Sequence, residues 1–183
     1  MYLPCLSVQT AVRVYLSLSP PGVSFRMLGP RNLLIHLPSL RSPELDVVTP
    51  PLDGTILPGV TRASVLALLS HFPLTTALPQ LPADMRIRTS ERVLTLSELF
   101  AASAAGTLRE VFCVGTAAVV IPAARIGWQR PRPGASAGTE TEVVEIVLPP
   151  AGGPGSLAQV LWERLVDIQE GRVEWEGWGV PSL

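Results

Sequence analysis

Hydrophobic residues recur at helical spacing in two parts of the chain. A helix is predicted over residues 61–72, because four apolar residues share one of its faces: Val65, Leu68, Leu69 and Phe72. Pro73 marks its end. A second helix is predicted over 156–170, where a stripe of apolar residues at the same spacing is followed by Gly171. Such stripes are typical of helices that pack against a core.

Two short stretches have the form of capping boxes. In this motif a Ser or Thr hydroxyl accepts the backbone N–H three residues on, and a Glu or Gln side chain reaches back. Thr95–Glu98 predicts the start of a helix over 96–105, with Gly106 just past its end. Ser156–Gln159 predicts the start of the helix over 156–170.

Shorter apolar or alternating runs predict strands at 33–37, 45–48, 108–114 and 143–148. They indicate a strand or an extended arm at 86–94, and a strand or a buried turn at 117–121. Strands mixed with short helices indicate an α/β or mixed α+β domain. The range 129–141 is rich in Pro, Gly, Ser and Thr and predicts a mobile surface loop. Residues 1–31 show little periodicity, although Val8, Val12 and Leu16 are spaced four apart and hint at a short helix.

The charge pattern excludes several classes of partner. The formal net charge is −1 and there is no basic run, so no nucleic-acid partner is expected. No apolar run reaches the length of about 18 residues that a membrane span needs. The two cysteines, Cys5 and Cys113, make no disulfide or metal pattern, and Cys113 is expected to be a buried thiol. We therefore expect an intracellular protein, cytoplasmic or mitochondrial.

Several conspicuous residues are interpreted structurally. His36 and His71 have no partner at metal-ligand spacing, so no metal site is predicted. Three tryptophans are expected in packing contacts: Trp162, Trp175 and Trp178. The Arg109–Glu110 dipeptide is expected to be a solvated or strand-edge pair.

The most informative feature of the composition is the absence of lysine, since all 14 basic residues are arginine. A lysine amine can act as a nucleophile toward carbonyl compounds. Arginine cannot replace it, because the pKa of the guanidinium group is too high and its geometry differs. Chemistry that depends on a lysine amine is therefore excluded for this chain by itself.

Three segments, taken in order, resemble the branched-chain amino acid aminotransferases, which are pyridoxal-phosphate enzymes of fold type IV. The segments are Val48–Arg62, then Glu91–Thr95 with Leu108–Ala117, and finally Asp167–Gly171. The resemblance covers roughly 32–178, and the tail Glu174–Trp178 is most similar to fungal members. It implies an incomplete large domain of the D-amino acid aminotransferase-like fold, a mixed sheet or pseudo-barrel with flanking helices.

The segment Leu57–Thr61 leads a loop into a predicted helix start. Free N–H groups and the positive end of the helix dipole make such a terminus suitable for a phosphate dianion. From these residues alone, Gly59 as a simple turn and Thr61 as a simple N-cap stay open. The resemblance implies that pyridoxal phosphate is held by Leu57, Gly59, Val60 and Thr61.

A second turn, Gly115–Ala117, follows a predicted strand, and its N–H groups could form an anion-binding concavity. By itself it could equally be a tight turn. The resemblance implies that Thr116 contacts the phosphate and that Gly115, Thr116 and Ala117 face the substrate carboxylate. We expect this turn and the one at Gly59 to lie side by side.

The chain also departs from the family pattern. The family's Schiff-base lysine has no counterpart, so no catalytic residue is assigned. Met27 stands where a glutamate should face the pyridine nitrogen, although Gly29 and Asn32 fit that stretch. The two-cysteine redox motif of some animal members is absent, because Ala118 and Ile121 occupy its place. The small N-terminal domain, which completes the substrate pocket in the family, has no counterpart here.

These departures shape the predicted organisation. Residues 1–31 are expected to be disordered or misassigned, and 32–183 to form a partial cofactor-binding large domain. The family function is transamination of leucine, isoleucine and valine with 2-oxoglutarate, and a homodimer is expected. The alternative is a noncatalytic remnant or truncated gene product that binds pyridoxal phosphate weakly or pairs with an intact paralogue.

Overall fold

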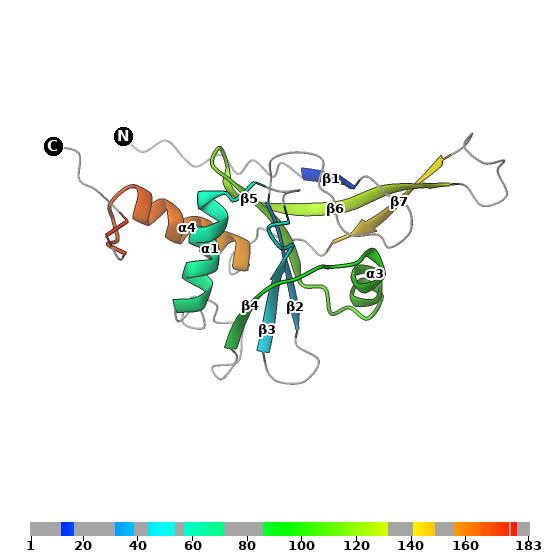
Figure 1. Cartoon of the computed structure of the whole chain (residues 1–183), viewed down its shortest axis with the longest axis horizontal. Coiled ribbons are helices and arrows are strands. Elements are labelled where there is room, and N and C mark those ends of the chain that lie inside the picture. Colours follow the sequence, from blue (N-terminus) through cyan, green and yellow to red (C-terminus); the bar gives the residue numbers. More distant parts are fainter. Residues whose placement is uncertain are drawn as a thin grey trace.

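The structure, a computed structural model, describes residues 12–16, 32–38, 44–53, 57–71, 86–131, 141–148, 156–175 and 177–178. The described part contains the helices α1 (Val60–His71), α3 (Leu96–Ala104) and α4 (Leu157–Gln169). Its strands are β1 (Val12–Leu16), β2 (Asn32–Pro38), β3 (Glu44–Thr49), β4 (Arg86–Glu91), β5 (Glu110–Gly115), β6 (Val119–Pro131) and β7 (Thr141–Val147). The three predicted helices and the four predicted strands are present, and β4 and β6 show that the stretches at 86–94 and 117–121 contain strands (Figure 1).

The strands form one mixed sheet in the order β1-β6-β5-β2-β3-β4, and β7 also pairs with β6. The long strand β6 pairs antiparallel with β5 near its start, and farther along with β1 in parallel and β7 antiparallel. The mixed α/β class is therefore confirmed. Among the described strands β4 pairs with β3 alone, so this part of the sheet does not close into the implied pseudo-barrel.

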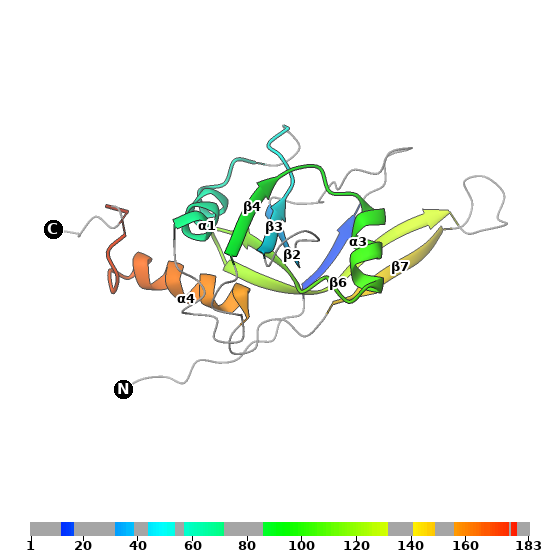
Figure 2. The same cartoon turned by 90° about the horizontal axis from the view of Figure 1, so that it is seen from below.

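Strand β5 lies at the centre of the core because both of its faces are covered. Val111 and Cys113 belong to a hydrophobic cluster on the side of α3, whereas Phe112 and Val114 belong to a second cluster with α1 and α4. Figure 2 shows α3 apart from α1 and α4. Successive strand side chains point to opposite faces, so a strand covered on both sides must be continuously apolar. This arrangement explains the apolar run that predicted the strand.

Both predicted N-caps are confirmed, but neither return contact forms. The hydroxyl of Thr95 accepts from the N–H of Glu98, and that of Ser156 from the N–H of Gln159, each at 3.2 Å. The Glu98 carboxylate is instead paired with Arg92. The Gln159 amide donates to the next turn of its own helix. In both boxes the Glu or Gln side chain therefore contacts a nearby side chain and not the backbone of the N-cap residue.

The glycines predicted to end two helices do so. Gly106 and Gly171 follow α3 and α4 with φ values of +66° and +69°. This left-handed conformation is the one that glycine adopts without a steric penalty at a helix C-terminus.

Two expectations about extended segments were wrong. The spacing from Val8 to Leu16 hinted at a helix, but Val12–Leu16 is strand β1, paired in parallel with β6. The predicted loop 129–141 begins too early, because β6 continues to Pro131, and Thr141 already belongs to β7. Residues 132–140 and the remainder of 1–31, with Cys5 and Met27, lie outside the described residues. Within the described part, no helix is both long and apolar enough to cross a membrane.

Candidate functional site

Helix α1 begins directly after the loop that the sequence singled out. The carbonyl of Gly59 accepts from the N–H of Ala63 at 3.1 Å, so Gly59 is the N-cap and Thr61 lies in the first turn. The N–H groups of such a first turn have no acceptor within the helix. The first turn also contains no acidic residue. The positive end of the helix dipole is therefore available to an external anion.

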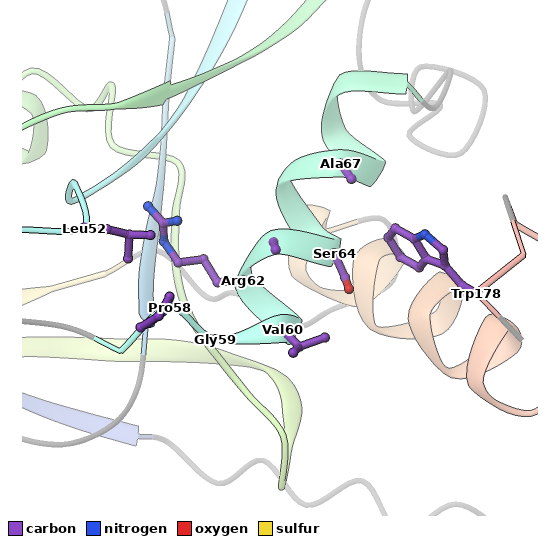
Figure 3. Close-up of a pocket in the computed structure, with 9 residues that line it drawn as sticks. Leu52, Pro58, Gly59, Val60, Arg62, Ser64, Ala67 and Trp178 are labelled. Atoms are coloured by element: carbon purple, nitrogen blue, oxygen red, sulfur yellow. The ribbon is translucent and has the colours of Figure 1, made fainter.

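The surface around this helix start is open and apolar. Val60 is 82% exposed and Leu57 is 67% exposed, whereas Gly59 and Thr61 are half-buried. A cleft of about 380 Å³ lies here (Figure 3), lined by Leu52, Pro58, Gly59, Val60, Arg62, Ala63, Ser64, Ala67 and Trp178. Two of the four predicted phosphate residues of this segment, Gly59 and Val60, line it.

The second predicted turn connects β5 to β6. Gly115 pairs with Val119, so the connection consists of three residues, of which Thr116 and Ala117 are exposed. Val119 has a φ of +56°, which is strained for a β-branched residue and fixes the shape of this turn. The turn lies at the same end of the sheet as the start of α1, which contacts β5 (Figures 1 and 2). Both predicted anion-binding turns thus occupy one end of the fold.

Arg62 is a site residue whose role no sequence pattern indicated, although it ends the segment that carried the resemblance. It is only 4% exposed. Its guanidinium group contacts Glu91 at 2.6 Å and donates to the Pro50 carbonyl at 2.9 Å. Its Nε has no hydrogen-bond partner among the described residues. The ionic contact spans 29 positions, which no local pattern could indicate.

Glu110 is the second residue whose role was missed. It was expected in a solvated or strand-edge pair with Arg109, but its carboxylate accepts from the N–H groups of Leu157 and Ala158 at 2.8 and 3.1 Å. It therefore caps α4 from strand β5. Burial raises the pKa of Glu110 above its ordinary value of 4.5, although the two backbone hydrogen bonds oppose this shift.

Several other residues singled out in the sequence lie in the described part of the chain. Cys113 is a buried thiol, as predicted. Trp162 and Trp175 pack against the cluster beneath α4, whereas Trp178 is 38% exposed and lines the cleft. In the described part of the chain, no three His, Cys, Asp or Glu side chains are grouped so that they could hold a metal ion.

Curated proteins similar to this chain are branched-chain-amino-acid aminotransferases. The mitochondrial protein of Saccharomyces cerevisiae is 34% identical over a match that covers 97% of this chain and 41% of the yeast protein. The cytosolic protein of Ovis aries is 32% identical over 95% of this chain and 38% of its own length. A Bacillus subtilis protein of the same name is 35% identical, covering 73% of this chain and 30% of its own length.

Two features of these matches matter. This chain spans less than half the length of these relatives. The yeast match also extends into residues 1–31, beyond the range of 32–178 over which the resemblance was recognised.

Solved structures give a coarser likeness. The Escherichia coli branched-chain amino acid aminotransferase is 21% identical, with a TM-score of 0.46 over 81% of this chain and 36% of that chain. No protein-family model matches the sequence.

Proposed function

Because this chain is related in sequence to the branched-chain-amino-acid aminotransferases along nearly all of its length, we propose that it forms a phosphate-binding wall of a pyridoxal-phosphate site. The observation that carries the proposal is the open N-terminus of α1. Its first turn has no acidic residue, it follows Gly59, and it lines a cleft. A phosphate group bound there would replace water at N–H groups that have no helical acceptor.

The proposed division of contacts follows the two turns. Gly59, Val60 and Thr61 would bind the phosphate through the first turn of α1, with Leu57 beside them. The exposed turn after β5 would add Thr116 for the phosphate, and Gly115, Thr116 and Ala117 for a substrate carboxylate. Their location at one end of the fold supports this division.

The residues present suit the phosphate of the cofactor but not its covalent attachment. The chain contains no lysine, so no side-chain amine can bond to the cofactor or move a proton at the substrate α-carbon. Pyridoxal phosphate would supply the electron sink for amino-group transfer when bound. We therefore propose that this chain alone binds the cofactor noncovalently and does not transaminate leucine, isoleucine or valine with 2-oxoglutarate.

A second candidate function is favoured by the same absence. A chain that retains a phosphate wall but has no lysine could act only as a noncatalytic partner, pairing with another copy or with an intact paralogue. The apolar surface at Leu57 and Val60 suits contact with another polypeptide. Size-exclusion chromatography of the chain, alone and mixed with an active relative, would separate these cases.

The direct test measures binding and turnover in parallel. Pyridoxine 5′-phosphate and pyridoxine differ only in the phosphate and cannot react with amines, so their dissociation constants isolate phosphate recognition. The purified chain should prefer the phosphate ester, and Thr61→Val or Thr116→Val should each weaken its binding about two- to tenfold. Equal affinity for the two compounds would contradict the phosphate-wall proposal.

Turnover is measured with each branched-chain amino acid and 2-oxoglutarate in the presence of pyridoxal phosphate. No glutamate should form, because no residue can provide the lysine chemistry. Borohydride reduction followed by peptide mapping should find no cofactor label except at the N-terminal amine. Steady turnover free of host enzyme would show that the noncatalytic assignment is wrong.

A further inference from the structure

Arg62 is unusual because it places a cation beneath the first turn of α1. It is 4% exposed, whereas its partner Glu91 is half exposed. A buried charge is tolerated only when it is paired and hydrogen-bonded. One guanidinium nitrogen, Nη2, makes both contacts, at 2.6 Å to the Glu91 carboxylate and at 2.9 Å to the Pro50 carbonyl.

These two contacts fasten the helix start to the sheet. Pro50 directly follows β3, and Glu91 is the last residue of β4, the parallel neighbour of β3. The two strand ends are themselves joined, since Thr49 is in register with Glu91 and its carbonyl accepts from the N–H of Arg92 at 3.0 Å. Arg62 therefore connects the first turn of α1 to a rigid corner of the sheet.

The unused donor of Arg62 points toward a ligand. The Nε of Arg62 is buried and has no hydrogen-bond partner among the residues that the structure describes. A buried donor without an acceptor destabilises the fold, and an acceptor supplied by a ligand removes that cost. Arg62 also lines the cleft at which Gly59 and Val60 start the helix (Figure 3). A positive group with an unused donor beside a helix N-terminus favours an anion in that cleft.

We propose that Arg62 is the positioning residue of this anion site. It holds the N–H groups of the first turn in the direction that a phosphate ester requires, by bridging to the ends of β3 and β4. This inference rests on the proposed phosphate-binding function. It predicts that recognition depends on the arginine side chain and not on its charge alone, because lysine has no donor at the position of the buried Nε and its ammonium group ends one bond short of Nη2.

The test compares Arg62→Lys and Arg62→Met with the control Arg172→Met. Arg172 is an exposed residue that follows α4 and pairs with Asp167 on that helix. The measured quantity is the ratio of the dissociation constant of pyridoxine to that of pyridoxine 5′-phosphate. A general loss of structure weakens both compounds equally and leaves this ratio unchanged. Urea unfolding followed by tryptophan fluorescence monitors stability in each variant.

The Arg62→Lys variant should lower the ratio about tenfold, the effect of one displaced charge-assisted hydrogen bond, and Arg62→Met should lower it at least as much. Arg172→Met should keep the wild-type ratio. If Arg62→Met does not fold, Arg62→Lys decides the question. If the wild-type chain prefers the phosphate ester and Arg62→Lys keeps the same preference, the proposed role of Arg62 is overturned and the proposed function stands. A wild-type chain with no preference would instead overturn the proposed function.

Discussion

Replacing Glu110 tests whether its carboxylate joins strand β5 to the start of helix α4. Glu110 stands on β5, and its two oxygens accept the N–H groups of Leu157 and Ala158, which are each 1% exposed. In Glu110→Ala both N–H groups lose their acceptor at a place that water reaches poorly. Each unsatisfied group costs about 1–3 kcal/mol.

The substitution also removes a carboxylate whose charged form is disfavoured by burial. This gain offsets part of the loss. We therefore expect Glu110→Ala to lower the free energy of unfolding by about 3 kcal/mol, towards the lower end of the summed range. For a chain of this length the midpoint of thermal unfolding should fall by about 6–12 °C. Urea unfolding followed by tryptophan fluorescence measures this loss, and Trp162 on α4 is one of the four tryptophans that contribute to the signal.

The control is Glu163→Ala, an exposed position on the same helix whose carboxylate contacts only the Gln159 side chain among the contacts described. It should change stability by no more than about 0.5 kcal/mol. If Glu110→Ala and Glu163→Ala proved equally mild, the capping role of Glu110 would be wrong.

The dependence on pH gives an independent check with a definite sign. The pKa of Glu110 is raised in the folded chain, so the folded state holds this proton more tightly than the unfolded state. Its contribution to stability is complete below the ordinary pKa of 4.5 and is lost as the pH rises through the raised value. The wild type should therefore lose stability relative to Glu110→Gln as the pH rises from 4.5. A relative gain over that interval would refute the assignment.

Three further predictions concern local structure. Thr95→Ala and Ser156→Ala each remove a confirmed N-cap and should each lower the free energy of unfolding by about 1 kcal/mol, additively in the double variant, as measured by urea denaturation. Gly171→Ala places a side chain at a φ of +69° and should cost roughly 1–2 kcal/mol in the same assay, whereas an unchanged midpoint would contradict that geometry. In a Cys5→Ser background the buried Cys113 thiol should react slowly with a disulfide reagent in buffer and rapidly in urea, and fast reaction in both would refute its burial.

Local patterns in the sequence were sufficient for most of the secondary structure. The capping hydroxyls of Thr95 and Ser156, and the glycines after two helices, act within a few residues, so their signals could be recognised without a fold. The continuous apolar run at β5 likewise predicted a strand, and the structure adds that both of its faces are covered. The segment Val48–Arg62 carried the family resemblance, and the composition alone established that no lysine is present.

Tertiary structure decided what the polar groups do. Arg62 meets Glu91 across 29 positions, and Glu110 meets the start of α4 across 47. The return contacts of both capping boxes do not form even though their alternatives are local: Glu98 pairs with Arg92, and Gln159 donates to Glu163. Periodicity reports only which face of an element is apolar. The partner of a charged or capping side chain depends on which distant segments the sheet brings together, and that is settled only when the chain has folded.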